Sequence, residues 1–206
     1  MYLSQLKLNP THPAARRDLG DAYQMHRTLS RAFATGPDGL VPRFLWRLER
    51  ESAPGASNSV LVQADGPGHW SELADLPGYL LGSATDKLVD LERLITDSRS
   101  LRFRLRANPA VKREGKRWGL HNEAEQLAWL SRQGTRLGFE LQGADVSQRE
   151  RVRVPQSRSG MHITVDCVQF DGQLGVTNAP ALRQGLLTGV GPAKALGLGL
   201  LSLAPI

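Results

Sequence analysis

The sequence has very little cysteine, since Cys167 is the only one among 206 residues. A single thiol excludes an internal disulfide framework and suits a reducing compartment. Cys167 lies in the stretch HITVDCVQF, where Ile163, Val165 and Cys167 alternate with polar residues as on one face of a strand. The sequence therefore predicts a buried structural thiol.

Long apolar runs are missing as well. The chain begins MYLSQLKLNPTH, without the basic segment and apolar run of a secretory signal, so no such signal is expected. No stretch approaches the roughly 20 apolar residues that a membrane helix needs. Hydrophobic residues still make up 40% of the chain, enough for the core of one large domain or two small ones. We therefore expect a cytoplasmic protein without a membrane partner.

The common metal and catalytic motifs are also missing. No pair of histidines has helical or zinc-finger spacing, and a single cysteine argues against a structural zinc site. A Gly-x-Ser-x-Gly elbow is not present, although sequence alone leaves a Ser-His-Asp arrangement open. The histidines are His12, His26, His69, His121 and His162. We expect neither a metal nor another cofactor.

The glycine-rich run of residues 185–205 fits no nucleotide-binding motif. No Gly-Lys-Ser/Thr follows at phosphate-loop spacing, and after Gly189 and Gly191 the third glycine of a dinucleotide fingerprint is replaced by Lys194. A helix is expected before these glycines and a strand after them, the reverse of the dinucleotide-binding order. They predict a loop in which backbone N–H groups and Lys194 approach a ligand closely. A tight turn against the first helix explains them equally well.

Positive charge is what the sequence has in excess. There are 26 Lys and Arg against 20 Asp and Glu, a net charge of +6, and a basic surface favours polyanions such as nucleic acid. The stretch LRFRLR alternates, so Arg102, Arg104 and Arg106 share one face of a strand. Three arginines on one face repel one another unless an anion or carboxylates lie across them. We favour anion binding over the alternative of a solvated edge strand.

Residues 18–33 (DLGDAYQMHRTLSRAF) predict an amphipathic helix. The apolar residues at three- and four-residue spacing form one stripe, and Asp18 or Asp21 can cap its start. Beside that stripe lies a second face made of Tyr23, His26, Arg27, Ser30 and Arg31. A phenol, an imidazole and two guanidiniums on one face can perform acid/base chemistry on a phosphodiester. The alternative is an ordinary solvated or hydrogen-bonded surface histidine.

The remaining pattern predicts two similar halves. Strands are expected at residues 2–8, 44–49, 59–63, 101–106, 139–146, 151–154, 161–170 and 198–203, and helices at residues 85–95, from Asn122 and at 179–187. Residues 108–116 look like the linker. Each half then reads β-α-β-β-α-β, which predicts an α+β protein with two ferredoxin-like domains, residues 1–110 and 111–206. The second carries a basic hairpin with Arg149, Arg151, Arg153 and Arg158.

Five blocks of sequence together resemble the CasE family of CRISPR-associated endoribonucleases. They are MYLSQLKLNP, DLGDAYQMHRTLSRAF, LRFRLRANP, EAEQLAWL and GVGPAKALGLGLLSLAP, in family order from the first residue to the last. The resemblance implies two ferredoxin-like domains and metal-independent cleavage of CRISPR precursor RNA at the base of the repeat hairpin. Attack by the ribose 2′-OH would leave a 5′-OH and a cyclic or 3′ phosphate.

The resemblance also implies roles for individual residues. The family's tyrosine and histidine fall on Tyr23 and His26, with His26 as general acid or base and Tyr23 positioning or deprotonating the 2′-OH. Arg27 and Arg31 would stabilise charge at phosphorus. The basic hairpin, Arg149 to Arg158, would enter the groove of the RNA stem, and the enzyme would stay on its product within the Cascade complex. Two other classes remain open: a non-catalytic scaffold for hairpin RNA, and a metal-dependent nuclease, against which the lack of a carboxylate cluster argues.

Overall fold

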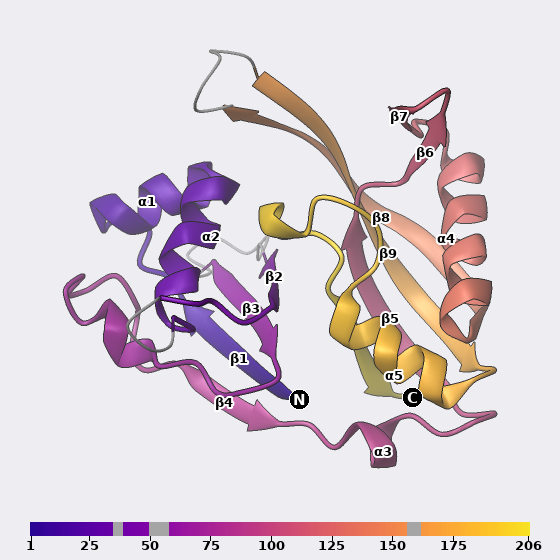
Figure 1. Cartoon of the computed structure of the whole chain (residues 1–206), viewed down its shortest axis with the longest axis horizontal. Helices are drawn as coiled ribbons and strands as arrows, with labels where there is room; N and C mark the ends of the chain where they lie inside the picture. Colours follow the sequence, from indigo (N-terminus) through magenta and orange to yellow (C-terminus); the bar gives the residue numbers. More distant parts are fainter. Residues whose placement is uncertain (35–38, 50–57, 156–161) are drawn as a thin grey trace. The chain divides into compact units, whose positions relative to one another are not determined.

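The computed structural model describes residues 1–34, 39–49, 58–155 and 162–206, and only the backbone of residues 153–155, 162 and 163. The chain forms two compact units (Figure 1). Unit 1 comprises Met1–Val89 with Ala195–Gly197, and unit 2 comprises Asp90–Lys194 with Leu198–Ile206. Among the described residues, no helix is long and apolar enough to cross a membrane.

Unit 1 is an antiparallel four-stranded sheet with helices inserted in its connections. Its elements are β1 (Tyr2–Lys7), α1 (Pro13–Gly20), α2 (Ala22–Arg31), β2 (Phe44–Glu49), β3 (Ser59–Ala64), η1 (Trp70–Leu73) and β4 (Thr85–Leu88). The sheet order is β2-β3-β1-β4, and every neighbouring pair is antiparallel. This is the β-α-β-β-α-β arrangement, with the short η1 in the place of the second helix.

The apolar stripe of α2 anchors it to this sheet. Met25 and Leu29 are fully buried and belong to the same core as Leu6 of β1 and Val60 of β3. Such a stripe stabilises a helix of this length chiefly through packing, because isolated short helices are marginal in water. The opposite face of α2 is thereby left for function.

The predicted single helix over residues 18–33 is wrong, because the chain breaks between α1 and α2. Asp21 caps α2, and its side chain accepts hydrogen bonds from the backbone N–H groups of Tyr23 and Gln24. Asp18 is not a cap: its side chain is fully buried and accepts a hydrogen bond from the Tyr79 hydroxyl at 2.9 Å. Pro13 begins α1, a position that suits its fixed φ.

The predicted helix over residues 85–95 is also wrong. Residues Thr85–Leu88 form β4, which pairs with β1, and only Leu91–Leu94 form a helix, α3. The side chain of Asp90 accepts a hydrogen bond from the backbone N–H of Arg93, which fixes the start of α3 after the strand.

Unit 2 repeats the same topology. After α3 come β5 (Ser100–Ala107), β6 (Ala110–Arg113), β7 (Lys116–Gly119), α4 (Glu123–Leu137), β8 (Phe139–Pro155), β9 (His162–Val176), α5 (Ala179–Thr188), η2 (Lys194–Leu196) and β10 (Leu201–Pro205). The last two residues of η2 are counted with unit 1. The main sheet has the order β10-β5-β9-β8, and β6 and β7 form a separate hairpin. Two ferredoxin-like units of an α+β protein, as expected from the sequence, are therefore present.

The division between the units differs from the predicted one after residue 110. β5 pairs with β9 and β10, so it opens the second sheet instead of closing the first. The predicted linker, residues 108–116, belongs largely to the β6–β7 hairpin. The expected strands 139–146 and 151–154 are parts of one long strand, β8, with register shifts at Leu141/Gly143 and Val146/Gln148.

Candidate active site and nucleic-acid interface

Helix α2 presents Tyr23 and His26 one turn apart. Tyr23 is 44% exposed, whereas His26 is half-buried and its ring stacks on Phe44 of β2, with centroids 4.9 Å apart. Phe33 stacks on the same Phe44. The imidazole therefore has a fixed ring plane, which a solvated surface histidine would lack.

The environment of His26 favours its neutral form. Its Nδ1 atom is buried without a hydrogen-bond partner among the described residues. Burial lowers the pKa of His26, because the charged imidazolium would lose its hydration. A neutral imidazole can accept a proton near neutral pH, as a general base requires.

An open pocket of about 260 Å³ lies on unit 1 between α1 and α2, and neither Tyr23 nor His26 is among the residues that line it. It is lined by Arg17, Gln24, Arg27, Thr28 and Arg31. Three of these residues carry guanidiniums, the groups best matched to phosphate oxygens. Arg17 comes from α1 and was missed by the sequence analysis, because only the break between α1 and α2 brings it alongside α2.

The three pocket arginines are held differently. Arg31 makes an ion pair with Asp75 at 2.5 Å and donates to the carbonyl of Glu72, and Arg17 contacts Asp18 at 2.7 Å. Arg27 is exposed and makes no ion pair within the described ranges. Arg31 and Arg17 are therefore preorganised, and Arg27 is the guanidinium left to meet an incoming anion.

The three arginines of β5 share one face, as the alternation predicts. Their burial alternates with that of Leu101, Phe103 and Leu105, which lie in the core of unit 2. Carboxylates lie across this face. Arg104 donates to Asp171 at 2.6 Å, Arg106 pairs with Glu150 at 2.5 Å, and Arg102 donates to the carbonyl of Pro205 at 3.2 Å.

Asp171 is the hub of these contacts on the β5 face. Burial alone would raise the pKa of Asp171, but hydrogen bonds donated by Arg104, Ser147 and Gln169 outweigh it and lower that pKa. The carboxylate is thus ionised at neutral pH and cancels part of the positive charge. The anion-binding role of this face stays a prediction.

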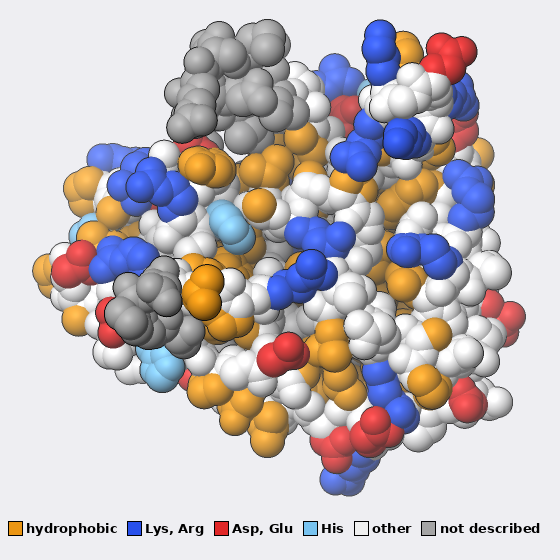
Figure 2. Space-filling model, viewed as in Figure 1, with side chains coloured by type: hydrophobic (Ala, Val, Ile, Leu, Met, Phe, Trp, Pro, Cys, Tyr) orange, Lys and Arg blue, Asp and Glu red, His pale blue; other side chains and the backbone are white. Residues whose placement is uncertain are grey.

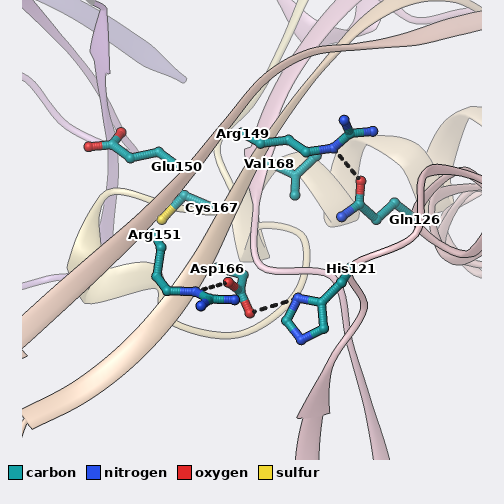
Figure 3. A pocket seen from close by; sticks show the side chains of 8 residues that line it. All are labelled: His121, Gln126, Arg149, Glu150, Arg151, Asp166, Cys167 and Val168. Atoms are coloured by element: carbon teal, nitrogen blue, oxygen red, sulfur yellow. Dashed lines mark hydrogen bonds and ion pairs between the residues drawn. The ribbon is translucent and has the colours of Figure 1, made fainter.

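Arg149 and Arg151 of the predicted basic hairpin line a second pocket, of about 230 Å³, on unit 2 (Figure 3). Arg151 donates to Asp166 at 2.9 Å, and His121 lies 3.5 Å from the other oxygen of that carboxylate. Arg149 pairs with Glu123 and donates to Gln126. The side chain of Arg153 and the whole of Arg158 lie outside the described residues.

Cys167 lines the same pocket from its buried side. It is free and 4% exposed, as predicted for a structural thiol. Burial raises its pKa to about 11, with Glu150 and Asp166 adding to the shift and Arg106 opposing it. The thiol is therefore protonated and a poor nucleophile at neutral pH.

Backbone geometry accounts for the glycine-rich loop. Gly189 and Gly191 have φ values of 75° and 77°, which favour glycine. A side chain at Gly191 would also stand 3.2 Å from the ring of Trp129. The Lys194 ammonium donates to the carbonyl of Gly191 at 2.8 Å. These contacts fit a tight turn, but Gly191 packs against Trp129 of α4 and not against the first helix as expected. Contact between this loop and RNA stays a prediction.

Comparison with known proteins assigns the chain, over its full length, to the family that its five sequence blocks resemble. The sequence matches the model of a family described as "CRISPR associated protein" over residues 1–205. It is 39% identical to the CRISPR-associated endoribonuclease Cse3 of Thermus thermophilus and 33% identical to the Cascade subunit CasE of Escherichia coli, with 100% of each chain covered. A structure of Cse3 bound to a 19-nucleotide RNA superimposes with a TM-score of 0.89 at 38% identity, covering 100% of both chains.

Proposed function

Because the chain belongs to the CasE (Cse3) family of CRISPR-associated endoribonucleases, we propose that it cuts CRISPR precursor RNA at the base of the repeat hairpin. The observation that carries this proposal is His26, which is half-buried and stacked on Phe44, on the same helix as the pocket arginines Arg27 and Arg31. Such a site supplies a base and fixed positive charge, which are the needs of phosphodiester cleavage without a metal.

The reaction is an internal transesterification. Neutral His26 takes the proton of the ribose 2′-OH, and the 2′-oxygen forms a bond to the adjacent phosphorus. The bond from phosphorus to the 5′-oxygen breaks, and that oxygen receives a proton to become the 5′-OH. The other product is a 2′,3′-cyclic phosphate, which water can open to a 3′ phosphate. Tyr23, exposed on the same helix face, orients the 2′-OH.

The pocket arginines stabilise the charge that builds on phosphorus. Arg27 has no ion pair within the described part of the chain and can bind a non-bridging oxygen directly. Arg31 is already held by Asp75, so it meets the substrate without losing much conformational freedom. The lowered pKa of His26 points to the base as its first role, since the protonated form is disfavoured before substrate binds.

Unit 2 holds the RNA in this proposal. Base edges in the deep major groove of an RNA stem are hard to reach, so shape and phosphate contacts dominate recognition. The groups assigned to it are the β5 arginines, Arg102, Arg104 and Arg106, the hairpin arginines, Arg149, Arg151, Arg153 and Arg158, and the loop residues Gly189, Gly191 and Lys194. The product hairpin stays bound, so turnover is close to single, and the protein works in the cytoplasm as a Cascade subunit.

The test is cleavage of the host's repeat RNA in the presence of a chelator. Wild type should cut once at the 3′ base of the hairpin and leave a cyclic or 3′ phosphate. His26→Ala should lose about 10²–10⁴-fold in single-turnover rate while hairpin affinity stays within a few-fold. His69→Ala, an exposed histidine of the same unit, is the matched control.

Each outcome of this test has a distinct meaning. An unchanged rate in His26→Ala would remove His26 from the mechanism. Tight binding without cleavage by either protein would favour a non-catalytic hairpin-binding scaffold. Loss of wild-type activity in the chelator would favour a metal-dependent nuclease.

A further inference from the structure

The β6–β7 hairpin is a feature of unit 2 that the proposed function leaves unused. Its strands pair with Val111 opposite Trp118, Lys112 opposite Arg117 and Arg113 opposite Lys116. Glu114 and Gly115 form the two-residue turn with φ values of 49° and 76°, the positive values that a type I′ hairpin turn requires. The ribbon forms its own two-stranded sheet, apart from the four-stranded one.

Like charges face each other across this ribbon. Lys112 lies directly opposite Arg117, and Arg113 directly opposite Lys116, so each pair shares a face at close range. All four side chains are exposed, and none makes an ion pair within the described ranges of the chain. This arrangement is unfavourable by itself and is relieved when an anion lies along the ribbon.

Cations of the main sheet of unit 2 have carboxylate partners that the cations of the β6–β7 hairpin lack among the described residues. Arg104 and Arg151 each pair with a carboxylate on the neighbouring strand β9, and Arg106 pairs with Glu150 of β8, two strands away. On the hairpin, Glu114 is the only acidic residue among ten, and it occupies the turn. Figure 2 shows Lys and Arg side chains gathered over the part of unit 2 where Figure 1 places β6 and β7. The hairpin therefore keeps a positive potential that the sheet has largely cancelled.

An exposed aromatic ring accompanies this charge. Trp118 is 57% exposed, whereas Trp46 and Trp129 are each 3% exposed. Because side chains alternate along a strand, Trp118 shares its face with Val111, Arg113 and Lys116. A large exposed indole between cations is the combination on which unstacked bases bind, with the ring contacting the base and the cations contacting the phosphates.

We propose that the β6–β7 hairpin binds a single-stranded stretch of RNA, with one base stacked on Trp118 and neighbouring phosphates on Arg113 and Lys116, which share the face of Trp118. A paired stem would offer phosphates but no free base face for the indole, so the single strand is favoured. The inference rests on the proposed function in one respect: it takes the strand to be the part of the same transcript that flanks the repeat hairpin.

The experiment compares two RNAs and follows binding. One RNA is the repeat hairpin alone, and the other adds a single-stranded flank. For wild type, the flank should strengthen binding. Trp118→Ala should reduce this increase in affinity by about 5- to 100-fold, which is the contribution of one base–aromatic stack. Where the flank increases the wild-type affinity by less than that, the variant should show no increase. Trp118→Phe should retain most of the gain, because phenylalanine keeps a stacking face.

A charge variant tests the phosphate contacts separately. Arg113→Ala/Lys116→Ala should reduce the salt dependence of flank binding by about 1.4 in the slope of log K against log salt, for two single-strand phosphates. Arg132→Ala, an exposed arginine on α4, should leave the gain unchanged. Thermal melting of each variant shows whether the fold is intact.

The two proposals can fail independently. Trp118→Ala should cleave the hairpin-only RNA at the wild-type rate, because that RNA has no flank to bind the β6–β7 hairpin. A wild-type protein that fails to cleave this RNA would therefore contradict the proposed function alone. No gain from the flank in wild type, or an equal gain in Trp118→Ala, would overturn the inference. Equal weakening of both RNAs by the charge variant would assign the hairpin to the stem and also overturn it.

Discussion

The two units share one topology, but Arg27 on α2 of unit 1 and the arginines on the β5 face of unit 2 are held in opposite ways. In unit 1, Arg27 lies exposed in the pocket between α1 and α2, and its guanidinium has no ion pair among the described residues. In unit 2, Arg104 and Arg106 lie on a sheet face and are already paired with Asp171 and Glu150. A common fold therefore does not fix a common chemistry, which depends on the individual side chains that each copy carries.

This difference separates the expected roles of the units. Arg104 and Asp171 are 45% and 30% exposed at their side chains, so their ion pair contributes about 1 kcal/mol or less to stability. Such an arginine still attracts phosphate, but with its net field reduced. Arg27, which has no ion pair among the described residues, keeps its full charge for an incoming anion. We therefore expect unit 2 to act on binding and unit 1 on the chemical step.

The largest expected effect tests this separation directly. Arg27→Ala should lower the single-turnover cleavage rate at saturating protein by about 10²-fold, because it removes a donor aimed at the phosphorane. Arg104→Ala should instead weaken RNA binding and reduce the salt slope of affinity by about 1. Filter binding and quenched-flow cleavage on the same RNA measure both quantities.

Arg16→Ala is the control for this comparison. Arg16 is exposed on α1 beside Arg17 but does not line the pocket, so its loss should change the rate little. Equal effects of Arg27→Ala and Arg104→Ala on both rate and affinity would show that the two units do not differ in role.

Periodicity was enough to predict the parts of the fold that local pattern determines. The alternation in LRFRLR predicted the strand and its arginine face, and three- and four-residue spacing predicted the buried stripe of α2 and the separate face with Tyr23 and His26. Asn122 was predicted as a cap and does accept a hydrogen bond from the backbone N–H of Ala124. Each of these signals acts over a few residues, within reach of a single-sequence argument.

Long-range pairing was beyond that argument. The assignment of β5 to the second sheet depends on its pairing with β9, which is more than 60 residues away by the register Ser100↔Gly175 to Ala107↔Val168. The burial of Asp18 just before the break involves Tyr79, whose hydroxyl donates to Asp18 across 61 positions of the chain. The entry of Arg17 into the pocket follows from that break. The sequence carries no local sign of these contacts.

The buried carboxylate of Asp18 and the half-exposed carboxylate of Asp171 should contribute differently to the free energy of unfolding. Asp18→Ala leaves the Tyr79 hydroxyl, in a side chain that is 1% exposed, without its partner, and should lower the free energy of unfolding by about 1–3 kcal/mol. Asp171→Ala breaks a half-exposed network and should cost about 1 kcal/mol or less. Chemical denaturation of the two variants beside wild type measures the difference. Equal losses would mean that burial does not set the strength of these contacts.

The smallest expected effect is a dependence of stability on pH that separates His26 from Asp171. The folded-state pKa of His26 lies below its unfolded value near 6.5, so the unfolded chain binds more protons between the two values. Stability is therefore full above pH 6.5 and falls as the pH drops through the folded-state pKa. Asp171 has a folded-state pKa below 3.8, so its contribution is lost only near and below pH 4.

Between pH 7.5 and pH 5, then, the His26 imidazole of the unfolded chain takes up a proton while the Asp171 carboxylate stays ionised. His26→Phe keeps a ring against Phe44. Its melting temperature should fall less between pH 7.5 and pH 5 than that of wild type, and the two falls should differ by about a few degrees at most. Asp171→Asn should follow wild type down to pH 5, because the wild-type carboxylate does not change charge there. His69→Phe, at an exposed site, controls for the loss of a histidine. If wild type and His26→Phe melt in parallel, the imidazole is not desolvated in the folded protein, and the argument for a neutral base at this position fails.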